Sequence, residues 1–211
     1  MDHIELKPYA FPHGVDVPRL MPFQEFPFNG DGYLAAEFLR LKEKHNIKTA
    51  FETGTCFGST AIWLSENFDK AITFENNEAN YEIAKRRAKL CAPELEVYNR
   101  DSVYGLNEFS GLLKPDETPI FFLDAHWGSH CPLIDELLAI WKMKTSPCIV
   151  IHDFLVPETD FGYDRTPDRK PFDRDLIDNY IAAIYENCHG IIANYPTKVE
   201  GARRGWISIE P

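Results

Sequence analysis

Short apolar runs alternate with helical patterns from Lys48 to Asp153, and few folds accommodate this alternation. The runs predict buried strands at 48–52, 71–74, 95–98, 119–123 and 148–151. Helical spacing predicts intervening helices at 59–67, 80–90 and 133–143. Four of the runs are almost continuously apolar, as expected of a parallel sheet covered on both faces. The run at 95–98 is shorter and half polar, which indicates an edge strand.

The flanking segments complete the pattern. Asp31 is suited to cap a helix that runs to about His45. A stretch rich in proline and charge at 155–173 interrupts the alternation. Beyond it we expect a helix at 174–188 and a closing hairpin of strands at 190–195 and 205–209.

The length of 211 residues suits one domain with a sizeable core. We expect a single α/β domain over 31–211, with a mostly parallel seven-stranded sheet and helices on both faces. Residues 1–30 are rich in Pro, Phe and His and show no period. We expect them to form an irregular arm, which either packs over the domain edge or acts as a lid over the substrate.

Charge and cysteine content exclude several classes of function. The formal net charge of -11 argues against non-specific binding to nucleic acid or to an anionic membrane. Five scattered cysteines without a CxxC pair argue against a structural zinc site and favour a reducing compartment. With neither a signal peptide nor an 18-residue apolar run, we expect a cytoplasmic protein that acts on a small molecule; a homodimer is left open.

Every expected strand of the parallel core is followed by an acidic residue. These acids are Glu52, Glu75, Asp101, Asp124 and Asp153. In an open parallel sheet, ligands bind beyond the carboxyl ends of the strands, where the strand order reverses. The placement predicts a ligand site at this edge, although surface loops of an acidic chain also carry acids.

The first of these loops is bracketed by Gly54 and Gly58. Their spacing differs from the Gly-x-Gly-x-x-Gly of dinucleotide sites, and the loop lacks the Lys-Ser/Thr pair of phosphate-binding loops. Glu75 follows the next strand, about 21 residues beyond Gly54, where an acid can accept hydrogen bonds from both ribose hydroxyls of an adenosine. The alternative for Glu75 is a solvated strand-end carboxylate. Asp101 and Ser102 are placed to meet the adenine amino group.

The string Phe-Glu-Thr-Gly-Thr-Cys-Phe-Gly-Ser-Thr at 51–60 resembles the first motif of class I S-adenosylmethionine-dependent methyltransferases, in the version found in small-molecule O-methyltransferases. The segments 122–127 and 151–154 resemble the sugar O-methyltransferases that modify macrolide antibiotics, and related cephalosporin-type modifying enzymes. The resemblance covers roughly 49–153, about half of the chain. It implies a Rossmann-like methyltransferase fold, in which the last strand runs antiparallel.

The resemblance also implies S-adenosylmethionine as cofactor, with Glu75 as the ribose-binding acid and Asp101 on the adenine side. The residues expected to hold this cofactor are Glu52, Gly54, Thr55, Phe57, Gly58, Ser59, Glu75, Asn76, Asp101, Ser102 and Asp124.

In the macrolide sugar enzymes, carboxylates after the fourth and fifth strands hold a magnesium ion that binds the substrate hydroxyls. Asp124 and Asp153 match these positions, and His152 stands where those enzymes have a second acid. Oxygen ligands suit magnesium, whereas an imidazole suits manganese, iron or zinc better. The resemblance therefore implies a magnesium or manganese site at Asp124, His152 and Asp153.

Methyl transfer to a hydroxyl requires in-line positioning and removal of a proton. His126, close to Asp124, is the candidate base, because the usual pKa of histidine near 6.5 suits proton abstraction. His130 and His152 are weaker candidates, and a histidine hydrogen-bonded within its loop is the alternative. The expected reaction is O-methylation of a small hydroxylated molecule, such as a sugar or nucleotide-sugar. A non-catalytic cofactor-binding protein and a nicotinamide-dependent reductase are the competing functions.

A long loop, 155–173, carries aromatic and basic groups around Phe161–Arg165. Long loops in compact domains often have a function, so this one and Arg203–Arg204 are candidates to contact an anionic or sugar substrate. Solvated surface charge is the alternative.

Overall fold

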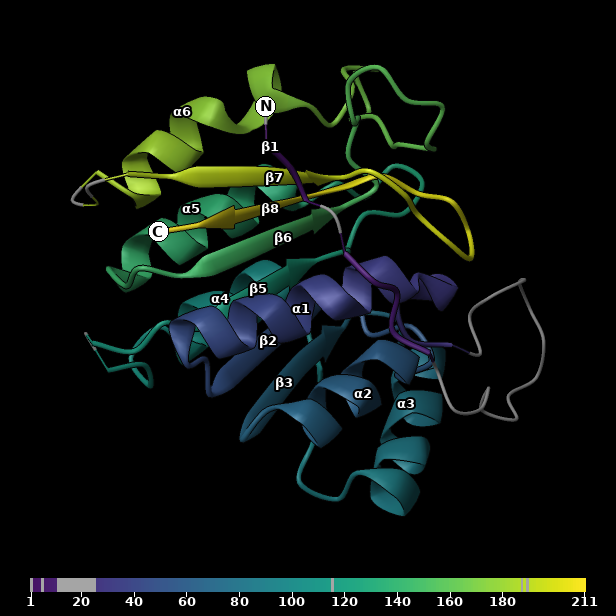
Figure 1. Ribbon diagram of the computed structural model, residues 1–211. Helices are drawn as coiled ribbons and strands as arrows, with labels where there is room; N and C mark the ends of the chain where they lie inside the picture. The colour runs from purple at the N-terminus through teal and green to yellow at the C-terminus, as the bar shows by residue number, and fades with distance from the viewer. Residues whose placement is uncertain (1, 5, 11–25, 115, 187, 189) are drawn as a thin grey trace.

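The computed structural model describes residues 2–4, 6–10, 26–114, 116–186, 188 and 190–211. Within them, eight strands form one sheet between two layers of helices (Figure 1). The strands are β1 (Asp2–Ile4), β2 (Thr49–Thr53), β3 (Lys70–Glu75), β4 (Glu96–Asn99), β5 (Ile120–Leu123), β6 (Cys148–His152), β7 (Ile192–Pro196) and β8 (Trp206–Glu210). The helices are the 3-10 turn η1 (Pro27–Gly30) and α1 (Gly32–His45), α2 (Ser59–Asn67), α3 (Glu78–Cys91), α4 (Ser102–Phe109), α5 (Leu133–Met143) and α6 (Arg174–Ile184).

The sheet order is β1-β7-β8-β6-β5-β2-β3-β4. Strands β2 to β6 pair in parallel, while β8 lies antiparallel between β6 and β7. The seven strands expected from the sequence are all present, β4 lies at an edge, and the last strand is antiparallel. The predicted fold class is thereby confirmed.

Alternating side chains of the strands feed two separate cores. On β5, Phe121 and Leu123 face the core under α4, α5 and α6, whereas Ile120 and Phe122 face the core under α1 and α2. All four are at most 1% exposed, which explains why this strand is apolar at every position. Burial of both faces makes the sheet the rigid base of the molecule.

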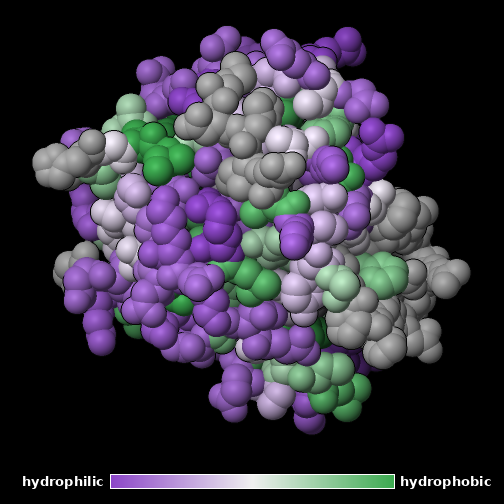
Figure 2. Space-filling model, viewed as in Figure 1, coloured by the Kyte–Doolittle hydropathy of each residue, from purple (hydrophilic) through white to green (hydrophobic). Residues whose placement is uncertain are grey.

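Hydrophilic residues cover most of the face shown in Figure 2, and hydrophobic ones are scattered among them. Among the described residues, no helix combines the length and apolar character needed to cross a membrane.

Two elements differ from the sequence-based expectation. Residues 2–4, expected within an irregular arm, form β1 and pair in parallel with β7, with Asp2 opposite Asn194. A segment of three residues is too short to show alternating hydrophobicity, so this strand is recognised only from its pairing with β7. Residues 102–109, where no helix was expected, form α4. Its interior Gly105 weakens the helical pattern, but a Cβ there would lie 2.4 Å from the ring of Phe74.

The end of the arm packs into the domain. Phe28 in η1 is 1% exposed and lies against Phe38, Trp63 and Phe122. The expectation of a lid falls largely on 11–25, which lie outside the described residues. Helix α6, expected to extend to residue 188, ends at Ile184.

The chain reverses its direction of travel across the sheet between β2 and β5. From β2 it proceeds outward through β3 to β4, and it then returns to β5 and continues to β6 on the other side. The carboxyl ends of these five parallel strands lie at the same end of the sheet, and the crevice at this end is where such sheets bind ligands. Glu75, Asp101, Asp124 and Asp153 lie there, whereas Glu52 does not.

Candidate functional site

The loop from β2 to α2 passes very close to the end of β5. Gly54 and Gly58 both have φ of +81°, a left-handed conformation that favours glycine. A Cβ on Gly54 would lie 2.6 Å from the backbone oxygen of Asp124. The backbone N–H groups of Gly54 and Thr55 both donate to the carbonyl of Phe74, at 3.0 and 3.2 Å. The loop is therefore clamped between the ends of β3 and β5.

Glu75, at the end of β3, is 6% exposed and is held by two backbone donors. Its Oε2 accepts from Cys56 N at 2.7 Å, and its Oε1 accepts from Asn77 N at 2.8 Å. Burial raises the pKa of Glu75, and these backbone hydrogen bonds oppose the rise. The backbone N–H of Asn76 acts in the same direction, so the carboxylate is surrounded by N–H donors from the glycine loop and from the turn after β3.

Glu52 lies inside the protein rather than at the ligand edge. It is 2% exposed, and its Oε2 accepts from Thr73 Oγ1 at 2.6 Å. Thr73 Oγ1 in turn lies 2.6 Å from Thr55 Oγ1. Burial raises the pKa of Glu52 well above its usual value, against the hydrogen bond from Thr73. Through Thr73, Glu52 is therefore connected to Thr55 and stabilises the glycine loop from inside the protein.

The side chains of Thr55, Phe57 and Ser59 are also buried, at 3%, 6% and 8% exposure. Arg87 of α3 donates to the carbonyl of Phe57 and, at 3.2 Å, to Ser59 Oγ. The side chains of these predicted cofactor residues therefore point into the protein and support the loop, so a ligand in the crevice would contact mainly the backbone of the loop.

The far side of the crevice is formed by the ends of β3 and β4. Asp101 caps α4 by accepting from Val103 N at 3.0 Å, and Ser102 is 4% exposed. His130, in the turn after β5, places Nε2 3.7 Å from Asp101 Oδ2 and 3.4 Å from Asn76 Nδ2. The turn thus bridges from β5 to β3 and β4, so His130 joins Asn76 and Asp101 on the side expected to hold the adenosine.

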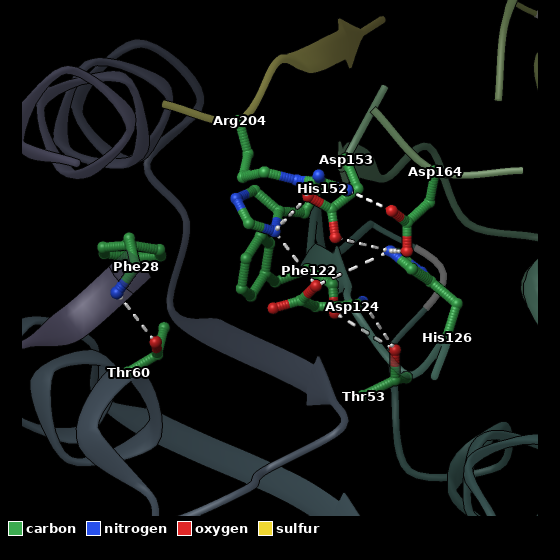
Figure 3. Close-up of polar contacts among 10 residues, drawn as sticks. All are labelled: Phe28, Thr53, Thr60, Phe122, Asp124, His126, His152, Asp153, Asp164 and Arg204. Atoms are coloured by element: carbon green, nitrogen blue, oxygen red, sulfur yellow. Dashed lines mark hydrogen bonds and ion pairs between the residues drawn. The ribbon is translucent and has the colours of Figure 1, made fainter. Parts of the chain in front are cut away.

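A second group of polar side chains gathers at the ends of β5, β6 and β8, where Figure 3 shows them converging. We call it the strand-end cluster; it consists of Asp124, His126, His152, Asp153, Asp164 and Arg204.

Two histidine–aspartate pairs form the centre of this cluster. His152 Nδ1 lies 3.0 Å from Asp124 Oδ1, and His126 Nε2 lies 3.0 Å from Asp153 Oδ2 (Figure 3). Asp153 has φ of +55°, a left-handed conformation that aspartate adopts more readily than most residues with a Cβ.

Arg204 and Asp164 close the cluster from the loops. Arg204 Nε donates to Asp153 Oδ1, and its Nη2 donates to Asp164 Oδ1. The two residues come from separate loops, before β8 and after β6. The sequence indicates them only as part of charged loops, because nothing in the spacing reveals that they pair with each other.

Opposite charges set the protonation of the cluster. Burial acts to lower the pKa of His152, but Asp153 and Asp124 outweigh it and raise that pKa to about 9. His126 behaves in the same way: burial acts to lower its pKa, but its hydrogen bond to Asp153 and the charges of Asp124 and Asp153 raise it. Burial favours a higher pKa for Asp153, but the charges of His152 and His126 hold it well below the usual value.

The ligand atoms expected to bind a metal do come together. Those of Asp124, His152 and Asp153 lie within 4.8 Å of one another, as do those of His126, Asp153 and Asp164. Both oxygens of Asp153, however, already accept hydrogen bonds from Arg204 and His126. The residue types suit a divalent cation, but the charge of the carboxylates is neutralised within the protein.

No protein-family model matches the sequence, and no curated protein matches it. Solved structures do match. The O-methyltransferase TomG from Streptomyces achromogenes, involved in tomaymycin synthesis and solved with SAM, is 16% identical, with 84% of this chain and 79% of that chain covered and a TM-score of 0.55. The O-methyltransferase from Bacillus cereus, solved with SAH, is also 16% identical, with 88% and 84% covered and a TM-score of 0.57.

The chain has the class I methyltransferase fold. The methyltransferase domain of the bacterial protein CtHen1-CN shares it as well, at 11% identity and a TM-score of 0.54, with 83% of this chain and 96% of that domain covered. These neighbours support the methyltransferase resemblance, but they do not single out the macrolide sugar enzymes. At these identities the likeness describes the fold and leaves the substrate open.

Proposed function

We propose that this chain is an S-adenosylmethionine-dependent methyltransferase that methylates an oxygen of a small hydroxylated molecule, such as a sugar or a nucleotide-sugar. The observation that carries the proposal is the position of Glu75. Its carboxylate is held between the glycine loop and the β3–α3 turn, and both of its oxygens lie at the carboxyl end of β3. Two neighbouring ribose hydroxyls need that pair of acceptors.

Asp124 joins the cofactor side to the strand-end cluster. Its backbone N–H donates to Thr53 Oγ1 at 3.1 Å, and its backbone oxygen faces Gly54 across the narrowest part of the loop. Its carboxylate pairs with His152. The methyl acceptor is expected beside this cluster, beyond the sulfur of the bound cofactor.

The strand-end cluster then serves the acceptor. Methyl transfer asks the protein to hold an acceptor oxygen in line and to accept its proton. His126 is the expected base in its neutral form: Nε2 donates to Asp153, so Nδ1 is the nitrogen that accepts the proton of the acceptor hydroxyl. The bond to Asp153 fixes the orientation of the ring and stabilises the imidazolium that forms. Phe172 packs edge-on against the same ring, with centroids 4.7 Å apart.

Calorimetry with S-adenosylhomocysteine tests the cofactor assignment. The wild-type chain should bind it, and Glu75→Ala should weaken binding by about 1–3 kcal/mol, because hydrogen bonds to a charged group are lost. Glu82→Ala is the matched control, since Glu82 is an exposed acid on the adjacent α3 and its removal should leave the affinity unchanged.

An equal affinity of the wild-type and Glu75→Ala chains would remove the ribose assignment. Binding of NADH without binding of S-adenosylhomocysteine would contradict the proposed methyltransferase function and favour a nicotinamide-dependent reductase.

A further inference from the structure

The strand-end cluster brings three carboxylates into one small volume. Asp124, Asp153 and Asp164 all lie within 4.0 Å of His126 Nε2 or are bonded to it. Their side chains are 23%, 14% and 39% exposed, so water screens them only in part. Carboxylates this close repel one another unless a cation lies among them.

Arg204 lies among them. Its Nε donates to Asp153 and its Nη2 to Asp164, so one guanidinium bridges two carboxylates that come from different segments (Figure 3). A planar guanidinium suits such bridging, because its five N–H donors lie in a rigid fork. Two donors are directed to the aspartates, and the side chain is 29% exposed, so other donors remain on the open side.

The backbone is built to hold Arg204 in this place. Gly162 N donates to the carbonyl of Arg203 at 2.9 Å, and Gly205 N donates to the carbonyl of Gly162 at 2.8 Å. A Cβ on Gly162 would lie 3.0 Å from Arg204 Cδ and Nη1. Glycine at 162 therefore provides the space through which the arginine side chain reaches the cluster.

We propose that the Arg204 guanidinium is the resident cation of the strand-end cluster and that this chain therefore works without a divalent metal. A metal held by Asp153 would lie next to the guanidinium as a like charge, and it would compete with Arg204 and His126 for the negative charge of the same carboxylate. The guanidinium has five N–H donors and is 29% exposed, so those not directed to the aspartates are available to bind an acceptor oxygen. The inference uses the proposed function only to place the methyl acceptor beside the cluster.

Titration with Mn²⁺, followed by electron paramagnetic resonance of the free ion, tests the proposal on the full chain after treatment with a chelator. The wild type should leave the signal of free Mn²⁺ unchanged at equimolar, micromolar concentrations. Arg204→Met removes the charged guanidinium and keeps an unbranched apolar stem, and it should bind Mn²⁺ at least about tenfold more tightly than the wild type. The double variant Arg204→Met with Asp153→Asn should lose that gain.

Arg203→Met is the matched control. Arg203 is the adjacent arginine, but it pairs with the exposed Asp160 outside the cluster, at 3.2 Å. This variant should behave as the wild type does. Arg204→Lys is a second variant in case Arg204→Met does not fold; a point charge cannot bridge both aspartates, so we expect Mn²⁺ binding between those of wild type and Arg204→Met.

Stoichiometric binding of Mn²⁺ by the wild type, lost in Asp153→Asn, would overturn the proposal. A wild type and Arg204 variants that are equally unable to bind Mn²⁺ would also overturn it, because the arginine would then not be what replaces the ion. Calorimetry with S-adenosylhomocysteine on the same samples separates the two proposals: a failure to bind this compound refutes the methyltransferase and leaves the Mn²⁺ result standing.

Discussion

Gly54 is the residue on which the conformation of the glycine loop depends most directly. Its φ is +81°, and a Cβ added to it would lie only 2.6 Å from the backbone oxygen of Asp124. A side chain at this position would therefore require both an unfavourable left-handed backbone and a movement of the end of β5. Left-handed backbone alone costs an alanine about 1–2 kcal/mol.

We therefore expect Gly54→Ala to destabilise the fold by at least about 2 kcal/mol and to abolish binding of S-adenosylhomocysteine. Urea denaturation and calorimetry measure the two effects. Gly111→Ala is the control, since a Cβ at Gly111 meets nothing within 4 Å, and it should change stability by less than about 0.5 kcal/mol. Equal stability of the two variants would show that the loop tolerates a side chain.

At the same scale, the site is predictable where a residue directly follows a strand. Glu75, Asp124 and His152 follow from the rule that ligands gather at the carboxyl ends of parallel strands. Asp164 and Arg204 do not follow, because they reach the site from loops whose course depends on tertiary contacts. Glu52 shows the opposite limit: it ends a predicted strand, yet it is turned inward by Thr73 and is buried behind the loop.

Among the elements, α1 is fastened to β8 by a buried ionic network. Glu210 is 1% exposed and accepts from Arg40 and Lys44 at 3.0 Å and pairs with His45 at 2.5 Å. Burial acts to raise the pKa of Glu210, but His45, Lys44 and Arg40 lower it from 4.5 to about 2. The network therefore favours the ionised glutamate.

Glu210→Gln should destabilise the protein by about 1–3 kcal/mol at pH 7, because Arg40, Lys44 and His45 lose the carboxylate charge that they share. A lowered pKa contributes stability above the ordinary value of 4.5, and this contribution is lost as pH falls toward 2. The difference between wild type and variant should therefore shrink between pH 4.5 and pH 2. Urea denaturation at about pH 7 and at about pH 3 measures it.

Glu186→Gln is the control, since Glu186 lies 4.0 Å from Lys144 in an exposed pair. It should have little effect at either pH. A Glu210→Gln difference that is the same at both pH values would show that the contribution of Glu210 is not ionic.

The predictability of elements follows from how much of their burial is periodic. Helix α5 is predictable because its buried face repeats along 11 residues, and strand β6 because all 5 of its residues are buried and most are apolar. Helix α4 is hidden because Gly105, which packs against Phe74, stands in its middle, and β1 is hidden because its partner strand lies almost at the other end of the chain. Local pattern cannot reveal a contact made by so few residues.

For the whole molecule, binding of the cofactor should be visible as heat stability. At a concentration one hundred times its dissociation constant, S-adenosylhomocysteine should stabilise the native state by about 2.7 kcal/mol. For a chain of this size that corresponds to a rise in Tm of about 5–10 °C, measured by calorimetry.

Methionine, which lacks the adenosine, should give no shift, and Glu75→Ala should give a smaller one with S-adenosylhomocysteine at the same concentration. A shift of equal size in Glu75→Ala would place the compound elsewhere on the protein.

The position of β8 also constrains the order in which the protein can assemble. This strand consists of residues 206–210 and lies between β6 and β7 in the sheet. Until these residues have left the ribosome, β7 therefore cannot join the sheet that ends at β6. The α/β half from β2 to β6 can form during synthesis, while β7, β8 and β1 must dock afterwards. Arg204 lies just before β8, so the strand-end cluster is completed in that same final step, and a chain stalled before it would have the glycine loop but an incomplete strand-end cluster.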